Sequence, residues 1–115
     1  MSKTILVVDD DAIIRRVCRA GLEAKGYRVI ELVEGSKVIK TIKQEGVDLV
    51  ILDIFMDDQE GMETAFMLLR EHEDIPVIMI SSDADYLEQA DMIVQATIQK
   101  PINISVLKET VENLL

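Results

Sequence analysis

Polar side chains that can bind metal or act as nucleophiles stand at the ends of four short aliphatic runs. They are an acidic triplet, a single acid, a hydroxyl pair and a lysine followed by proline: Asp9, Asp10, Asp11, Asp53, Ser81, Ser82 and Lys100. Three carboxylates brought together repel one another unless a cation lies between them. Mg²⁺ is the expected ion, because it prefers oxygen ligands and typically takes one or two carboxylates plus a phosphate.

The other groups of this set suit a phosphoryl group better than a carbonyl substrate. Ser81 offers a hydroxyl and Lys100 a positive charge, both of which can engage phosphoryl oxygens. An aspartate can itself attack phosphorus and become an aspartyl phosphate. No His or Cys is placed to compete as the nucleophile, so an aspartate is the candidate.

These groups would meet if the aliphatic runs are strands of one parallel sheet. The runs cover residues 5–8, 49–52, 77–80 and 92–98, the last interrupted by Gln95 and Thr97. Short runs rich in β-branched residues predict strands covered on both faces. Residues 27–33 are also strand-like, but their charges place them nearer a sheet edge. The carboxyl ends of parallel strands lie at one edge, so the polar groups should converge there.

Segments with helical spacing of apolar residues separate the strands. Apolar stripes lie within residues 13–22, 38–42, 62–69 and 106–115, and Gly46 is placed to end the second helix. Residues 83–91 form the weakest helical pattern because they are short and acidic. The alternation predicts an α/β fold with a doubly wound parallel sheet and helices on both faces.

Length and charge restrict the domain count and the partners. A chain of 115 residues accommodates one core, which must be aliphatic because only two Phe and two Tyr occur. The formal net charge of −10 disfavours direct binding to nucleic acid or to anionic lipid. A cytoplasmic location is expected, since Cys18 has no disulfide partner and neither a membrane span nor a signal peptide is evident.

Four motifs in this order resemble the response-regulator receiver domains of two-component signalling. They are Val7-Val8-Asp9-Asp10, Leu52-Asp53 with Met56 three residues on, Ser81 after a strand, and Lys100-Pro101. The likeness covers essentially the whole chain. It implies one receiver domain over residues 1–115, with five parallel strands in the flavodoxin-like order 2-1-3-4-5 and five flanking helices.

The resemblance also implies a signalling switch rather than an enzyme that turns over a metabolite. Asp53 would accept a phosphoryl group from a histidine kinase, a histidine phosphotransfer protein or a small phosphodonor. Ser81 and Lys100 would engage the phosphoryl oxygens, with a cis Lys100-Pro101 peptide. The affinity for a downstream protein, which the sequence does not identify, would then change.

The resemblance implies a Mg²⁺ site as well. Asp10 and Asp53 would bind the ion directly, and Asp9 would bind it mainly through water. The backbone carbonyl of Phe55 would complete the protein ligands. These assignments agree with the magnesium site that the acidic residues alone predict at the sheet edge.

The chain departs from the common receiver pattern in several places. Thr97 stands where receivers usually carry an aromatic residue, which calls the usual aromatic switch into question and directs attention to another output surface. Asp57 replaces a common proline, and Ser82 adds a second hydroxyl near the site. The segment 81–100 is shorter than the common pattern by about three residues, which predicts a reduced fourth helix.

Simpler interpretations of the same residues stay open. The triplet 9–11 could serve only as helix caps, as Asp11 is expected to do, and Asp53 could merely end a strand. Ser81 and Ser82 could be ordinary turn residues. Roles outside the site are also assigned: His72 to the solvated surface, Met62, Met67, Met79 and Met92 to the core or its margin, Cys18 to the core, Gly61 to a turn, and Asn103 to a helix N-cap.

Two other functional classes compete with the phosphorylated switch. One is a pseudo-receiver that binds partners without phosphate, which Thr97 and Asp57 favour. The other is a haloacid-dehalogenase-like phosphatase, in which Asp9 and Asp11 would be the acids. The chain is short for that class of phosphatase, and Asp53 would have no role in it.

Overall fold

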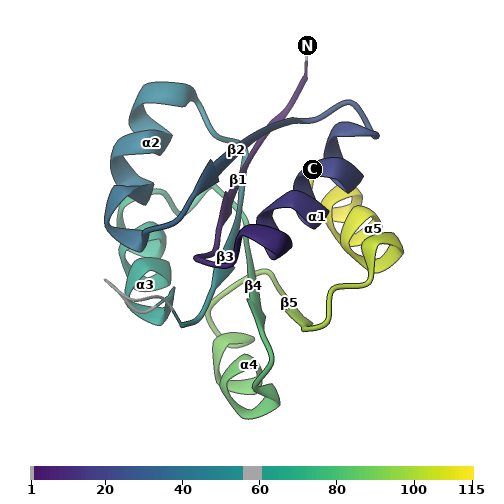
Figure 1. Ribbon diagram of the computed structural model, residues 1–115. Helices are drawn as coiled ribbons and strands as arrows, with labels where there is room; N and C mark the ends of the chain where they lie inside the picture. The colour runs from purple at the N-terminus through teal and green to yellow at the C-terminus, as the bar shows by residue number, and fades with distance from the viewer. Residues whose placement is uncertain (1, 56–60) are drawn as a thin grey trace.

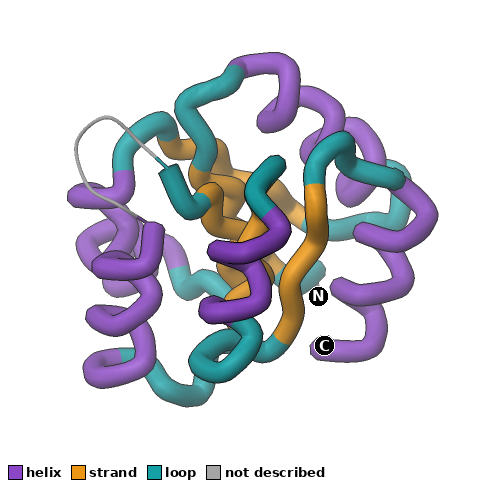
Figure 2. The backbone as a smooth tube through the Cα atoms, turned by 90° about the horizontal axis from the view of Figure 1, so that it is seen from below, coloured by secondary structure: helices purple, strands orange, loops and turns teal. Residues whose placement is uncertain are grey.

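The computed structural model describes residues 2–55 and 61–115, which form a parallel sheet with helices on both faces (Figures 1 and 2). In chain order the elements are β1 (Thr4–Val8), α1 (Ala12–Glu23), β2 (Arg28–Leu32), the 3-10 helix η1 (Gly35–Lys37), α2 (Val38–Glu45), β3 (Leu49–Asp53), α3 (Gly61–Glu71), β4 (Val77–Ser81), α4 (Ala84–Ala90), β5 (Ala96–Gln99) and α5 (Ile104–Leu114). The strand order β2-β1-β3-β4-β5 confirms the predicted fold class and topology.

Two aliphatic layers explain why the central strands are buried throughout. Side chains alternate along each strand, so Ile5 and Val7 of β1 face one layer while Leu6 and Val8 face the other. Helices α1 and α5 cover the first layer, and α2, α3 and α4 cover the second (Figure 1). Cys18 is buried in the first layer, as predicted.

The helix ends follow the signals in the sequence. Asp11 caps α1 by accepting a hydrogen bond from the backbone N–H of Ile13, and Asn103 caps α5 in the same way. Gly46 ends α2 in the left-handed region, with φ of 66°. The fourth helix, α4, has only seven residues, which agrees with the predicted reduction.

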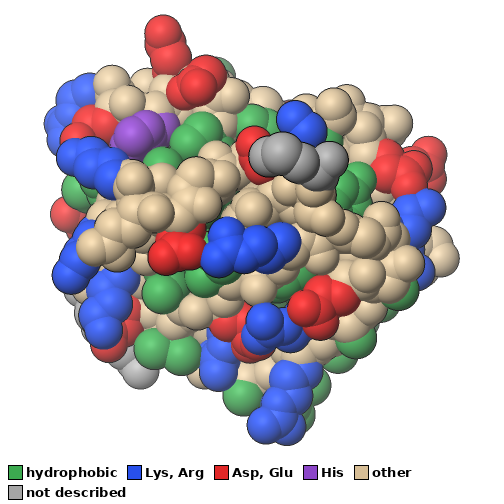
Figure 3. All heavy atoms as spheres, turned by 90° about the horizontal axis from the view of Figure 1, so that it is seen from above, with side chains coloured by type: hydrophobic (Ala, Val, Ile, Leu, Met, Phe, Trp, Pro, Cys, Tyr) green, Lys and Arg blue, Asp and Glu red, His purple; other side chains and the backbone are tan. Residues whose placement is uncertain are grey.

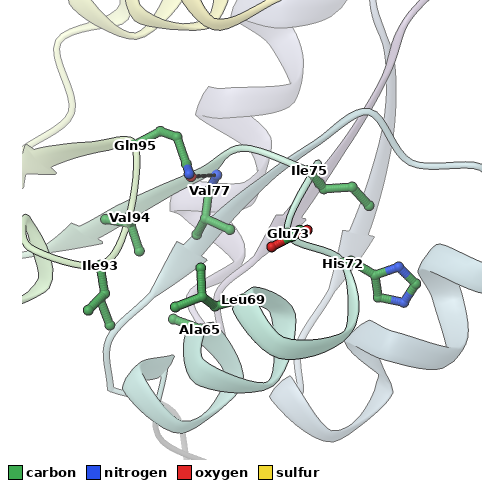
Figure 4. Close-up of a pocket in the computed structure, with 9 residues that line it drawn as sticks. All are labelled: Ala65, Leu69, His72, Glu73, Ile75, Val77, Ile93, Val94 and Gln95. Atoms are coloured by element: carbon green, nitrogen blue, oxygen red, sulfur yellow. Dashed lines mark hydrogen bonds between the residues drawn. The ribbon is translucent and has the colours of Figure 1, made fainter.

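The fifth strand begins later than predicted, because residues 92–95 form the turn after α4. At this turn the side-chain oxygen of Gln95 accepts a hydrogen bond from the backbone N–H of Val77, at 2.7 Å (Figure 4). The side chain of Gln95 therefore accepts the hydrogen bond from Val77 that the backbone carbonyl of a neighbouring strand would otherwise accept. Met92 is 88% exposed at this turn, so its assignment to the core was wrong, whereas Met79 is fully buried.

The rim of the sheet where the strands begin carries acidic and basic side chains side by side (Figure 3). His72 directly follows α3 at this rim and is half-buried rather than fully solvated. It lines a small pocket between α3 and the segment before β5 (Figure 4). Met56 and Asp57, on which two sequence arguments depend, lie outside the described residues. No helix in the described ranges is long and apolar enough to cross a membrane.

Candidate functional site

Three carboxylates meet where β1 and β3 end. The two strands pair in parallel with Val8 opposite Leu52, so the residues that follow, Asp9 and Asp53, reach the same edge of the sheet. One carboxylate oxygen from each of Asp9, Asp10 and Asp53 lies within 4.8 Å of the others. The structure thus brings together the acids that the strand pattern predicted to converge, and Asp11 turns away to cap α1.

A lysine from the end of β5 joins this cluster. Lys100 Nζ lies 3.0 Å from Asp9 Oδ2 and 3.5 Å from Asp53 Oδ1. The Lys100-Pro101 peptide bond is cis, as predicted, and the backbone N–H of Lys100 donates to the carbonyl of Ser81 at 2.8 Å. One cation is therefore shared between two acids that belong to different strands.

Ser81 lies at the end of β4, between the strands that carry the acids and the lysine. Its side chain is buried, and its Oγ accepts a hydrogen bond from the backbone N–H of Asp83 at 3.0 Å. An oxygen that accepts a hydrogen bond retains its own O–H as a donor. Ser81 can therefore still donate to an anion at the sheet edge, whereas Ser82 is exposed.

The site perturbs the protonation of its own groups. Burial, and then the nearby Asp9 carboxylate, raise the pKa of Asp53 from 3.8 to about 6, although Lys100 acts in the opposite direction. Burial opposes the charged form of Lys100, but its contacts with Asp9 and Asp53 raise its pKa overall. The folded chain thus holds more negative charge at this edge than a single lysine balances.

The donor set fits a hard divalent cation. Asp9 is fully buried, and its Oδ1 accepts from the backbone N–H of Asp11 at 2.9 Å. Its Oδ2 makes no hydrogen bond of acceptable geometry with any described residue, even though Lys100 is close. A buried carboxylate oxygen without a hydrogen bond, beside two further carboxylates, is available to a hard cation such as Mg²⁺ that prefers oxygen ligands.

Gly61 has a role at this site that the sequence did not reveal. A Cβ at this first residue of α3 would lie 2.1 Å from the carbonyl oxygen of Asp53 and 2.7 Å from Cα of Ile54. Only glycine allows the helix to approach the end of β3 so closely. The sequence placed a turn here, but the approach depends on the fold and could not be predicted from neighbouring residues.

An aromatic pair connects the segment after Asp53 to α4. The rings of Phe55 and Tyr86 meet edge to face, with centroids 4.8 Å apart and an interplanar angle of 84°. Thr97 lies on β5 opposite Met79, at an open hollow between α4 and β5. The side chain of Phe55 thus has an observed contact, and its carbonyl as a metal ligand stays a prediction.

Comparison with known protein families agrees with the fold and the site described above. The family model described as the response regulator receiver domain matches residues 5–112. The response regulator GtcR of Aneurinibacillus migulanus is 36% identical over 106 residues, covering 90% of this chain and 43% of that protein. The transcriptional regulatory protein YvrH of Bacillus subtilis is 36% identical over 104 residues, covering 87% of this chain and 44% of that protein.

A solved structure extends the comparison to three dimensions. The response regulator TrrA of Thermotoga maritima, crystallised in complex with Mg²⁺ and BeF, has a TM-score of 0.91 and 32% identity, and the match covers 98% of this chain and 99% of that one. The chain belongs to the response regulator receiver domain family, the phosphoacceptor signalling switches of two-component systems. It spans less than half the length of GtcR and of YvrH.

Proposed function

We propose that Asp53 accepts a phosphoryl group in a Mg²⁺-dependent reaction and that the phosphorylated chain binds a downstream protein with altered affinity. The observation that carries the proposal is the meeting of three carboxylates and one ammonium group at a single sheet edge. TrrA, which shares the fold at 32% identity, holds Mg²⁺ and a fluoride complex of beryllium. That pairing of a cation with a compact anion supports the same kind of site here.

Each residue of the site has one role in the proposed phosphoryl transfer. An Asp53 carboxylate oxygen attacks phosphorus, the bond from phosphorus to the donor breaks, and its electron pair leaves with the donor imidazole or acetate. Asp10, Asp53 and the Phe55 carbonyl would hold Mg²⁺ directly and Asp9 mainly through water, and the bound ion would supply positive charge that offsets the phosphoryl oxygens.

Two side chains then hold the transferred group. Lys100 moves its ion pairing from Asp53 to the phosphoryl oxygens, which it can do because its flexible stem already places Nζ between two acids. Ser81 donates its O–H to a second oxygen. The new charge favours a rearranged packing of the loops around the site, and that packing changes the partner surface.

The phosphoryl donors we propose are a histidine kinase, a histidine phosphotransfer protein and small phosphodonors. The output we propose is a protein contact, because the net charge of −10 opposes direct binding of this domain to nucleic acid. Transfer to and hydrolysis from its own Asp53 would be the only chemistry of the domain.

Intact-mass measurement with acetyl phosphate tests the proposal. The wild-type chain should gain one phosphoryl group with Mg²⁺ and none with EDTA, and Asp53→Asn should gain none. Asp74→Asn is a matched control, because it removes an exposed acid before β4, at the opposite rim. A wild-type chain that is never labelled would support the pseudo-receiver, and phosphatase turnover that survives in Asp53→Asn would support the phosphatase.

A further inference from the structure

Arg15 of α1 contacts the backbone between two of the clustered acids. Its Nη1 donates to the carbonyl oxygen of Asp9 at 2.8 Å, and its Nε donates to Glu31 Oε1 at 3.1 Å. The side chain of Arg15 is only 15% exposed. It therefore joins the loop after β1 to the neighbouring strand β2 through two well-formed hydrogen bonds.

Glu31 is itself held firmly. It lies on β2 opposite Val7, and its second carboxylate oxygen accepts a hydrogen bond from Arg19. Arg19 also donates to the carbonyl of Val29 at 3.1 Å. Both carboxylate oxygens of Glu31 thus accept hydrogen bonds from arginines of α1. Glu31 therefore holds the guanidinium of Arg15 in the orientation that reaches the Asp9 carbonyl.

The carbonyl that Arg15 contacts belongs to the peptide unit that joins Asp9 to Asp10. On the N-terminal side of Asp9, the backbone is held by a hydrogen bond from the N–H of Asp9 to the carbonyl of Leu32, at 3.1 Å. The bond from Arg15 fixes the carbonyl end. This hydrogen bond opposes changes in the backbone torsions between Asp9 and Asp10, and an uncompensated change in those torsions would move the two carboxylates relative to one another.

We propose that Arg15, braced by Glu31, is a positioning residue that holds Asp9 and Asp10 in the arrangement that binds Mg²⁺. The inference rests on the proposed function of the site. Arg15 acts through a backbone carbonyl and does not touch the ion or the phosphoryl group. Removing a partner that is hydrogen-bonded to a metal-binding side chain typically lowers metal affinity by about 10- to 100-fold. Since Arg15 acts through the backbone, we expect the lower end of this range.

The loss of the charge of Arg15 and the loss of its hydrogen bond predict opposite changes in Mg²⁺ affinity for Arg15→Gln. Removing a positive charge near three carboxylates should by Coulomb's law strengthen the binding of a cation. Removing the donor that orients the Asp9–Asp10 peptide should weaken it. Arg15→Lys separates the two effects further, because it keeps the charge but a single ammonium group lacks the fork that reaches both Asp9 and Glu31.

Calorimetric titration with Mg²⁺ alone tests the inference, with thermal unfolding in EDTA as a check on the fold. The Mg²⁺ dissociation constant should rise by about tenfold in Arg15→Gln and by a smaller factor in Arg15→Lys. Arg16→Gln is the matched control, since Arg16 is the exposed neighbour on the same helix, and its affinity should equal or slightly exceed that of the wild type.

The outcomes separate this inference from the proposed function. Unchanged or tighter Mg²⁺ binding by folded Arg15→Gln would overturn the inference alone, as would a lowered melting temperature without a change in affinity. If Arg15→Gln does not fold, wild-type affinity in Arg15→Lys would overturn it. A wild-type chain that binds no Mg²⁺ would overturn the proposed function and this inference together.

Discussion

Replacing Asp53 with asparagine in Mg²⁺-free buffer should stabilise the folded chain. Burial and the Asp9 carboxylate raise the pKa of Asp53 from 3.8 to about 6, so the folded state holds this proton more tightly than the unfolded state does. Ionised Asp53 therefore lowers the free energy of unfolding. This cost is absent below the unfolded pKa and complete above the folded pKa.

The size of the effect follows from that shift. One pKa unit corresponds to about 1.4 kcal/mol, so a shift of roughly two units corresponds to about 3 kcal/mol at pH values near 7.5. Near pH 4.5, where folded Asp53 is mostly protonated, the same relation gives a destabilisation of only about 1 kcal/mol. Asparagine keeps the shape of the side chain without its charge, so Asp53→Asn should be more stable by these amounts.

Urea unfolding in EDTA at the two pH values measures the difference directly. Asp74→Asn serves as the control, because removing an exposed charge should change stability by no more than about 0.5 kcal/mol. Added Mg²⁺ should stabilise the wild type and act less on Asp53→Asn, since the variant lacks one ligand. An Asp53→Asn variant that is less stable than the wild type at the higher pH would refute the electrostatic reasoning.

Three further predictions concern the surroundings of the site. Gly61→Ala should lower the free energy of unfolding in urea by about 3 kcal/mol, because the added Cβ meets backbone at 2.1 Å; a change below about 1 kcal/mol would contradict the close approach. A double-mutant cycle of Phe55→Leu and Tyr86→Leu should show a coupling of about 0.5–1.5 kcal/mol, and additive losses would show that the ring contact contributes nothing. Lys100→Met should destabilise the chain at neutral pH, because it leaves the fully buried Asp9 carboxylate without its cation, and urea unfolding that matches the wild type would exclude the pairing.

The central strands were predictable because each is a short aliphatic run between clear helix signals. Helical spacing of apolar residues predicted α1 and α2, with Asp11 as the cap of the first and Gly46 as the end of the second. The parallel topology predicted that Asp9 and Asp53 lie together. These features depend on local pattern and on the rule that parallel strands end at one edge. The start of β5 was missed because the side chain of Gln95 replaces a backbone acceptor, which a hydropathy pattern does not reveal.

Contacts between distant segments account for the features that the sequence did not show. The place of Arg15 beside the Asp9 carbonyl depends on how α1 packs against β2, and its helical position alone is consistent with a solvated arginine. The contact of Phe55 with Tyr86 depends on the path from β3 to α4. Sequence pattern therefore predicts which acids share the edge, and tertiary packing decides which residues hold them in place.

Peptide mass spectrometry after treatment with acetyl phosphate and Mg²⁺ identifies the residue that carries the phosphoryl group. We expect the phosphoryl group on the peptide that contains Asp53, and on that residue within it. A phosphoryl group on Asp9 or Asp10 instead would show that the acid at the end of β3 is not the acceptor.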